Sequence, residues 1–462
     1  MKVSSRLAHV LLVLLLLVCG GIFYTIHLLS DGVFDVGDGV HHYQLSRYSW
    51  QHPELFLHHW GKPFFILLSS PFAQFGYDGI VLFNVLCAVC TAWAAAACVR
   101  LLSSRFQATA GLLVLFTPLY LAVSISGLTE PLFGLVLMLS ILLVLRKKFL
   151  AAALLISFLP FVRSEGFLLL PLFAIVLLIR GRWKLLPLLA AGTVAYSVIG
   201  GIYFEDFLWL IHQNPYRGAE EIYGSGPLWH FVPHFKYLLG SAGALCFLAA
   251  AAWTAWPYSR KRKENEFIHE EFWLLLGCFF TYFIAHSLFW KFGLFGSLGL
   301  HRVMAAISPL AAVVIAVNLQ RAISFVPKRF SWIPIVFAAL VVTANIVQTF
   351  RQDRIPFKVT DEQQPLVDAA KAIKDQKLEN ELLYAHHPYF TFLLDRDPYD
   401  PARTRDLWAL KAQRNNLPKG AIIAWDAHFW QETGVSLESL RADPALEQVK
   451  EFGSGMVVFR VK

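Results

Sequence analysis

A polar segment near the N-terminus holds carboxylates and imidazoles at close spacing. Asp35 and Asp38 lie in a glycine-punctuated stretch, FDVGDGVHHY. Imidazoles follow at His41, His42, His58 and His59. A loop carboxylate can take the proton of an attacking hydroxyl group, which is general base catalysis. Two other interpretations stay open: a solvated Asp/Gly turn, or a site for a divalent cation such as Mn²⁺ or Zn²⁺, although no ligand spacing here is diagnostic.

Two further polar clusters each follow an unusually short apolar segment. Ser124–Glu130 follows Ala108–Val123, and Arg163–Glu165 follows Phe149–Val162. At about 1.5 Å per residue these segments reach only about 24 and 21 Å, against a hydrocarbon core of about 30 Å. Polar backbone below a membrane surface needs a cavity or water. We therefore expect a hydrophilic cavity ringed by Glu130, Arg163 and Glu165; the alternative is two ordinary loops with a surface ion pair.

Arg302 lies at the start of a late apolar segment, Val303–Leu319. An arginine beside hydrocarbon is costly unless it reaches the headgroups or binds an anion, and its planar guanidinium suits a phosphate. The apolar segments hold no Asp, Glu, Lys or Arg near their centres, and apart from His9 and His27 near the two ends of Leu7–Leu29 only His286 is a histidine inside one. Transporters coupled to ions usually need such groups, so this absence favours another class of protein.

The elements that position these residues are membrane spans. The 462 residues are 56% hydrophobic and only 16% charged, which excludes a soluble enzyme. Eleven apolar segments are predicted to cross or nearly cross the membrane: Leu7–Leu29, Gly79–Leu102, Ala108–Val123, Pro131–Leu145, Phe149–Val162, Phe167–Ile179, Leu185–Phe204, Tyr237–Trp256, Phe272–Trp290, Val303–Leu319 and Ser331–Phe350. We interpret the first as a retained anchor, because it lacks a small-residue cleavage pattern.

The net charge of +8 is distributed as a topology pattern, so we expect no nucleic-acid binding. Cations concentrate in alternate short loops: Lys2, Arg6; Arg100, Arg105; Arg146, Lys147, Lys148; Arg180, Arg182, Lys184; Arg260, Lys261, Arg262, Lys263; Arg321, Lys328 and Arg329. The positive-inside rule places these loops and the N-terminus in the cytoplasm. The longer loops and the C-terminal tail are then extracytoplasmic or periplasmic, and the chain is a multi-pass protein of the cell (inner) membrane.

The chain divides into a transmembrane module, residues 1–350, and a tail, residues 351–462. The first extracytoplasmic loop is 30–78, and its apolar part Pro63–Phe75 is too short to span, which favours a helix in the interface. The tail is predicted to be a small α/β domain. Its expected strands are Leu382–Tyr384, Ala421–Trp425 and Met456–Val461, and its expected helices are Asp361–Gln376 and Leu437–Gln448. All six cysteines lie in apolar segments, so no disulfide framework is expected.

Several of these motifs together resemble the GT-C glycosyltransferases, which include protein O-mannosyltransferases and lipid A aminoarabinose transferases. The family's first-loop motif, an Asp with a Tyr and with an Arg nine positions later, resembles Asp38, His42, Tyr43 and Arg47, with Gly39 in place of a second acid. His59–Gly76 resembles the segment that follows, with Gly61-Lys62-Pro63 replacing His-Pro-Pro. Thr129-Glu130-Pro131, Arg163–Gly166 and the Arg302–Pro309 segment resemble later motifs of the family. The likeness covers Leu7–Leu319, and the tail resembles no family.

The resemblance implies an α-helical polytopic GT-C enzyme of the cell envelope, acting on a polyprenyl-phosphate sugar donor, with a hexose such as mannose transferred. The acceptor would be a hydroxyl of a glycan, lipid or protein, and no cofactor is expected, with a divalent cation as the alternative. Catalytic roles fall to Asp38 as base in an inverting reaction and to Glu130. Substrate-binding roles fall to Asp35, His42, Tyr43, Arg47, His59, Lys62, Arg163, Glu165 and Arg302, with Arg302 stabilising the departing phosphate.

Other classes predict different features. A flippase or transporter of lipid-linked sugars would carry charged residues at mid-membrane and internal repeats, and a scaffold that displays the tail would have featureless outer loops. Neither pattern is present. A lipid-linked glycan polymerase or ligase uses the same kind of carrier, and the sequence leaves this alternative open.

Overall fold

The computed structural model describes residues 5–103, 105–215, 224–260, 266–352, 354–413, 417–453 and 455–462. Lys2, Lys261, Arg262 and Lys263, which entered the charge analysis, lie outside these residues. The helices of the first half are α1 (Ser5–Leu28), α2 (Asp38–Tyr48), α3 (Pro63–Ala73), α4 (Tyr77–Leu102), α5 (Gln107–Leu115), α6 (Pro118–Ser124), α7 (Glu130–Leu145), α8 (Phe149–Ile156) and α9 (Leu170–Ile179). They are followed by α10 (Ala191–Phe204), α11 (Trp209–His212), α13 (Phe235–Leu239), α14 (Ser241–Arg260), α15 (Ile268–Glu270), α16 (Cys278–Phe292), α17 (Ser308–Ile323) and α18 (Ile333–Gln352).

Shorter helical turns extend or join these helices. The 3-10 turns are η1 (Pro53–Leu57), η2 (Leu159–Phe161), η3 (Ser164–Leu168), η4 (Trp183–Ala190), η6 (Leu294–Gly296), η7 (His301–Ile307), η8 (Lys328–Phe330) and η9 (Leu407–Ala409), and η5 (Glu271–Gly277) is π-helical. Every predicted apolar segment is helical over most of its length. Among the described residues, six helices are long and apolar enough to cross a membrane: Arg6–Leu28, Tyr77–Leu102, Trp183–Phe204, Ile268–Phe292, His301–Ile323 and Lys328–Gln352.

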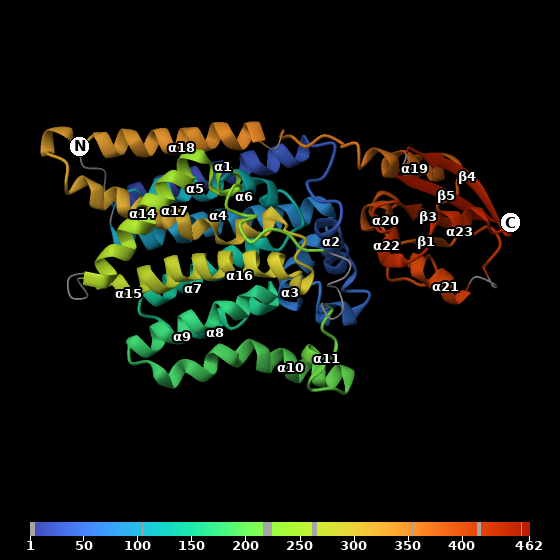
Figure 1. The fold of residues 1–462 in the computed structure, drawn as a ribbon, viewed down its shortest axis with the longest axis horizontal. Coiled ribbons are helices and arrows are strands. Elements are labelled where there is room, and N and C mark those ends of the chain that lie inside the picture. Colours follow the sequence, from blue (N-terminus) through green and yellow to red (C-terminus); the bar gives the residue numbers. More distant parts are fainter. Residues whose placement is uncertain are drawn as a thin grey trace.

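The helices of residues 5–352 lie side by side (Figure 1). α4 packs against α1, α5 and α7 through small residues, and Ala94 to Ala97 are all buried. Small side chains allow helix backbones to approach closely within a membrane. The outer helices α1, α10 and α18 instead expose leucine, valine and isoleucine side chains. Such a surface is stable against lipid, which agrees with the predicted multi-pass membrane protein.

The predicted span Ala108–Val123 differs from the structure, because α5 and α6 meet at an angle of 65°. Thr117 precedes Pro118, and the ring of a proline disfavours helical backbone at the residue before it. Thr117 is accordingly extended, with ψ 126°, and Pro118 begins α6. The predicted span Phe149–Val162 is also interrupted: α8 ends at Ile156 and the 3-10 turn η2, which contains Pro160, follows. Each interrupted segment leads into one of the polar clusters, Ser124–Glu130 and Arg163–Glu165.

The tail is an α/β domain, as predicted, around a five-stranded sheet in the order β2-β1-β3-β5-β4. Its strands are β1 (Leu383–Ala385), β2 (Thr404–Arg405), β3 (Ile422–Asp426), β4 (Leu446–Phe452) and β5 (Met456–Val461). β1 is parallel to β2 and β3, whereas β5 is antiparallel to β3 and β4. The tail helices are α19 (Gln364–Asp375), α20 (Pro388–Leu393), α21 (Leu410–Gln413), α22 (Trp430–Thr433) and α23 (Leu437–Arg441).

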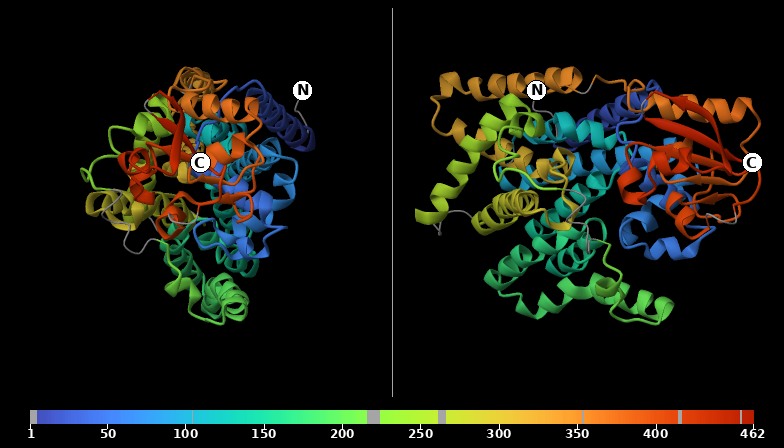
Figure 2. Two further views of the ribbon diagram at one scale, coloured as in Figure 1. Left: turned by 90° about the vertical axis from the view of Figure 1, so that its right-hand side faces the viewer. Right: turned by 45° about the vertical axis from the view of Figure 1, so that its right-hand side comes forward.

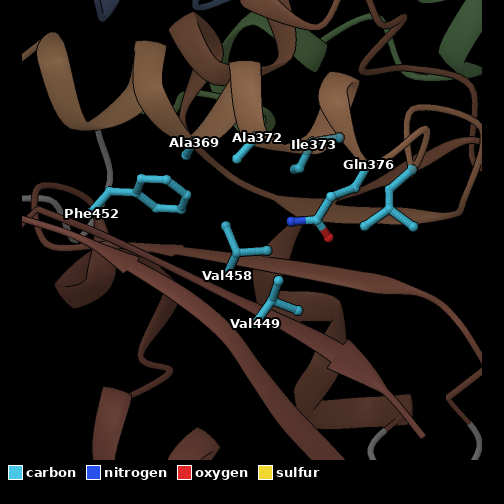
Figure 3. Close-up of a pocket in the computed structure, with 8 residues that line it drawn as sticks. Ala369, Ala372, Ile373, Gln376, Val449, Phe452 and Val458 are labelled. Atoms are coloured by element: carbon cyan, nitrogen blue, oxygen red, sulfur yellow. The ribbon is translucent and has the colours of Figure 1, made fainter.

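The predicted helix Leu437–Gln448 is wrong over its second half. α23 ends at Arg441, and the residues from Leu446 form strand β4. Pro444 cannot continue a helix and disfavours helical backbone at the residue before it, so the chain leaves the helix here. β4 is covered by α19, whose residues Ala369, Ala372 and Ile373 line a small hollow with Val449, Phe452 and Val458 (Figure 3).

The tail lies against one end of the helices, beside α2 (Figures 1 and 2). Gln44 of α2 donates hydrogen bonds of 3.0 Å to the Pro388 carbonyl and 2.8 Å to the Thr391 hydroxyl. His52 contacts Asp397 at 2.8 Å. The first loop and the tail therefore form one continuous wall at this end of the molecule.

Candidate functional site

The first loop is folded so that both aspartates face the same space. Asp38 is the first residue of α2, and the Asp35 carboxylate accepts a 2.7 Å hydrogen bond from the Gly39 amide. Gly39 in turn meets the loop before α7, since a Cβ on Gly127 would lie 2.1 Å from the Gly39 carbonyl oxygen. That loop is fixed by Asn84 of α4, whose amide donates to the Ser126 and Leu128 carbonyls at 2.7 and 2.8 Å.

Arg302 joins three carboxylates that come from distant parts of the sequence. Its guanidinium bonds to Asp38 and lies 3.2 Å from an oxygen of Asp35 and 3.2 Å from an oxygen of Glu130. η7 carries Arg302, α2 carries Asp38, and Glu130 begins α7. Glu130 is fully buried, whereas the Asp38 side chain keeps 42% of its surface exposed. Asp38 is thus the accessible carboxylate of the group.

Glu130 is shared by a second guanidinium. Arg163 donates hydrogen bonds to Glu130 at 2.8 Å, to the Thr129 hydroxyl at 3.1 Å and to Glu165 at 2.9 Å. His286 of α16 lies 3.3 Å from the same oxygen of Glu165. A buried charge needs partners of opposite sign, and this chain of alternating charges supplies them. Glu130, Arg163 and Glu165 are therefore linked in one network, and the hydrophilic cavity that they were expected to surround stays a prediction.

Lys62 and His42 border this network. Lys62 has a positive φ of 68° and donates a 2.9 Å hydrogen bond to Ser164, next to Arg163. Trp60 stacks with the rings of His41 and His42 at centroid distances of 4.7 and 4.8 Å. Lys62 therefore lies near Arg163, and His42 of α2 lies against Trp60.

The pKa values of Asp35 and Asp38 are shifted in opposite directions. Burial raises the pKa of Asp35 above its ordinary value although Arg302 opposes this effect. Burial also acts on Asp38, but the charge of Arg302, supported by His42, outweighs it and holds the pKa of Asp38 below its ordinary value. Burial lowers the pKa of His41 to about 4. At neutral pH Asp38 is therefore a carboxylate and His41 is uncharged.

Three of the predicted substrate-binding residues point elsewhere. Tyr43 packs edge-on against Tyr77 and against Phe392 of the tail. Arg47 bonds to the Gln74 carbonyl at the end of α3. His59 packs against Trp209 and lies 3.3 Å from the Gln213 carbonyl. These contacts join the first loop to α3, α11 and the tail, and they do not reach Arg302.

Sequence reasoning did not assign Thr129, Ser164 and His286 to the site. Thr129 and Ser164 stand directly beside Glu130 and Arg163, so their positions were inside the motifs already singled out. His286 was the histidine that lies inside an apolar segment away from its first and last three residues, which was the available indication. The participation of tail residues next to α2 had no indication in the sequence.

The aspartates and histidines suggested as metal ligands make other contacts in this structure. In the part of the chain that the structure describes, no group of three or more His, Cys, Asp or Glu side chains is arranged to hold a metal ion. Asp35, Asp38 and Glu130 all face the guanidinium of Arg302. His41 and His42 stack on Trp60. In this structure these carboxylates therefore pair with Arg302, and the divalent-cation alternative stays a prediction.

No protein-family model and no curated protein matches this chain. Solved structures do. ArnT from Cupriavidus metallidurans, bound to undecaprenyl phosphate, matches with a TM-score of 0.62 and 13% identity over 99% of this chain and 98% of its own. The archaeal oligosaccharyltransferase AglB from Archaeoglobus fulgidus, in complex with an inhibitory peptide and a dolichol-phosphate, matches with a TM-score of 0.56 and 11% identity over 92% of this chain and 70% of its own. Both have the GT-C architecture.

The chain has the GT-C fold. The match to ArnT is longer than the sequence resemblance, which ended at Leu319, and it includes the tail. Within this GT-C fold, the acidic first loop, the loop before α7, the turn after α8 and the start of η7 converge around Arg302 and Arg163. The order of motifs that suggested the family is thus matched by their proximity in space.

Proposed function

We propose that this protein is a membrane glycosyltransferase that transfers a sugar from a polyprenyl-phosphate carrier to a hydroxyl acceptor. The observation that carries the proposal is the contact of Arg302 with Asp35, Asp38 and Glu130 inside a GT-C fold. An accessible carboxylate beside a planar cation suits a reaction that needs a base for the hydroxyl and a positive charge for a departing phosphate.

The reaction is an inverting substitution with Asp38 as the base. The acceptor oxygen attacks the anomeric carbon while its proton passes to the Asp38 carboxylate. The bond between that carbon and the phosphate oxygen breaks, and the electron pair leaves with the polyprenyl phosphate. Arg302 stabilises the departing anion through two parallel hydrogen bonds. Asp35 positions the turn through its bond with the Gly39 amide.

Arg302 connects donor binding to the strength of the base. The guanidinium that now bonds to Asp38 lowers the pKa of that carboxyl group, which makes Asp38 a weak base. A donor phosphate competes for the same guanidinium. When the phosphate draws it away, the pKa of Asp38 rises and the carboxylate becomes a stronger base as the substrate arrives.

The second guanidinium extends the anion site. Arg163 and Lys62 lie on the far side of Glu130 and can neutralise additional charge on the donor phosphate. Glu130 holds both guanidinium groups at a fixed separation and orients sugar or acceptor hydroxyls. Glu165 keeps Arg163 in place through its 2.9 Å bond.

The proposed substrates are supported by the fold and by the lipids bound in two similar structures. ArnT and AglB were solved with undecaprenyl phosphate and dolichol-phosphate, and a carrier of the same chemistry is proposed here, with a hexose such as mannose as the sugar. The acceptor is a glycan, lipid or protein hydroxyl. Transfer takes place on the extracytoplasmic face, with residues 1–350 as the transmembrane catalytic module, the N-terminus in the cytoplasm and the tail 351–462 outside. We propose the cell (inner) membrane as its location.

A lipid-linked glycan polymerase or ligase remains the second candidate, because a match to an oligosaccharyltransferase fits a glycan donor as well as a single sugar. The deciding experiment supplies purified protein with polyprenyl-phosphate hexoses and with polyprenyl-linked oligosaccharides. We expect mass spectrometry to detect loss of the sugar from the monosaccharide donor. Turnover of the oligosaccharide donors alone would support the polymerase or ligase, and turnover of neither would contradict both.

A further inference from the structure

One edge of the tail sheet faces the first loop. β1 runs into His386 and His387, and the parallel strand β3 runs into His428 and Phe429. Open α/β sheets bind ligands outside the carboxyl ends of their parallel strands. Figure 1 shows α20 and α22, which follow these two strand ends, on the side of the tail nearest α2.

This edge is close to the candidate base. A Cβ on Gly37, the residue before Asp38, would lie 3.8 Å from the ring tip of Phe429. The rings of His386 and His387 pack on Phe429 at centroid distances of 5.4 and 5.0 Å. A molecule held at this edge would therefore have its reactive group beside the accessible Asp38 carboxylate.

His387 presents a buried donor that lacks a protein acceptor. His387 is 2% exposed, and its Nδ1 accepts a 3.2 Å hydrogen bond from the Tyr389 amide. Burial lowers the pKa of His387 to about 3, so the ring is neutral and its proton is on Nε2. Among the described residues, Nε2 has no hydrogen-bond partner. Because Nδ1 faces α20, Nε2 points away from that helix. A buried donor without an acceptor is costly, and a ligand oxygen would relieve this cost.

The surrounding groups are those that recognise a sugar. His386 lies 2.7 Å from Asp406 and 3.6 Å from Glu432, which fixes an array of donors and acceptors. Trp408 lies in η9, two residues after Asp406, and Trp430 begins α22 directly after Phe429. Their side chains are exposed, with 60% and 37% of the residue surface accessible. Flat aromatic faces with a few convergent polar groups suit a molecule that has both apolar faces and hydroxyls.

We propose that this edge, formed by His386, His387, Phe429 and Trp430, binds a sugar unit of the acceptor and directs its hydroxyl toward Asp38. The proposal rests on the proposed transferase function and adds the class of acceptor, a carbohydrate, and the part of the chain that selects it. His387 donates from Nε2 to a sugar oxygen, and the tail is thereby a wall of the site.

The test uses the full chain in a detergent without sugar groups and methyl glycosides of glucose, galactose and mannose as probes. Saturation-transfer NMR is expected to show ring-proton signals for at least one of these glycosides. The His387→Asn substitution keeps an oxygen that can accept from the Tyr389 amide but removes Nε2. We expect this variant to weaken binding by about tenfold, the effect of one lost hydrogen bond.

Two further variants keep the test decisive. Trp430→Ala changes an exposed side chain, so it is expected to preserve the fold and weaken the same signals. Arg441→Gln, on the exposed face of α23, is the matched control and should bind as the unmodified protein does. Absence of signals from the unmodified protein would overturn the proposal. Signals from His387→Asn and Trp430→Ala that are as strong as those from the unmodified protein would also overturn it. The Asp38→Asn variant separates the two proposals, since it should lose transfer while retaining the sugar signals.

Discussion

Arg302 and Asp38 are 264 positions apart in the sequence, and their side chains are bonded to each other. The contact joins the start of the η7–α17 segment to the first turn of α2. It neutralises an arginine at the end of an apolar helix, which would otherwise be costly to bury. The same pair supplies the two opposite charges that a substitution at a phosphate-linked carbon requires.

We expect Asp38→Asn to reduce transfer by about 100-fold or more, because the amide keeps the shape but cannot accept the proton. The measurement is the release of sugar from a polyprenyl-phosphate hexose by purified protein. Asp35→Asn should have a smaller effect, since Asp35 is less accessible and its oxygen is used by the Gly39 amide. An inactive Asp35 variant beside an active Asp38 variant would assign the base to Asp35.

Arg302→Lys should lower transfer by about 100-fold, which is comparable to Arg302→Ala. Lysine keeps the positive charge but has no planar pair of donors, so it cannot bind Asp38 and a phosphate as the guanidinium does. Activity is compared at equal amounts of folded protein, determined by size-exclusion chromatography. A fully active lysine variant would show that the position needs only a cation that reaches the headgroups.

The orientation can be measured with single cysteines introduced into the chain with its own six cysteines replaced. Positions Ser225 and Ala442 lie in segments predicted to be extracytoplasmic, and Ser103 and Ser324 in segments predicted to be cytoplasmic. A membrane-impermeant thiol reagent applied to intact cells or spheroplasts should label the first two only. Labelling of Ser324→Cys without labelling of Ser225→Cys would reverse the proposed topology.

The tail should lose stability as the pH rises. Burial opposes the charge of His386, but hydrogen bonds to Asp406 and Glu432 outweigh it and raise its pKa to about 10, from an ordinary 6.5. The stabilisation is therefore complete below pH 6.5 and is lost as the pH rises toward about 10. Urea unfolding followed by tryptophan fluorescence should show this decline, and His386→Gln should remove it. The His428→Gln variant is the control and should keep the decline, whereas a decline that persists in His386→Gln would exclude His386 as the cause.

The sequence was sufficient for the fold class because long apolar runs determine where helices form in a membrane. It was also sufficient to group Glu130, Arg163 and Glu165, whereas Arg302 was noted as a separate cluster. Each stands at the end of an apolar segment, and we expected all of these ends on one side. A charged residue in that position has few alternatives to pairing with another.

The remaining features depend on contacts that no local pattern contains. The 65° bend between α5 and α6 was missed because the apolar run is continuous across Pro118. Leu437–Gln448 was assigned to a single helix, although strand β4 pairs with β5 and tertiary pairing overrides the helical pattern. Tyr43 and Arg47 matched a family spacing, but the side chains of α2 point in several directions, and only one face reaches Arg302.

The shared use of Glu130 has a consequence for product release. The network joins two guanidinium groups, Arg163 and Arg302, to four carboxylates: Asp35, Asp38, Glu130 and Glu165. A donor phosphodiester brings one negative charge, whereas the released phosphate monoester carries nearly two above its second pKa of about 6. An excess of fixed negative charge therefore repels the spent carrier more strongly than the fresh one. Inhibition of turnover by added polyprenyl phosphate should accordingly weaken as the pH rises through that value.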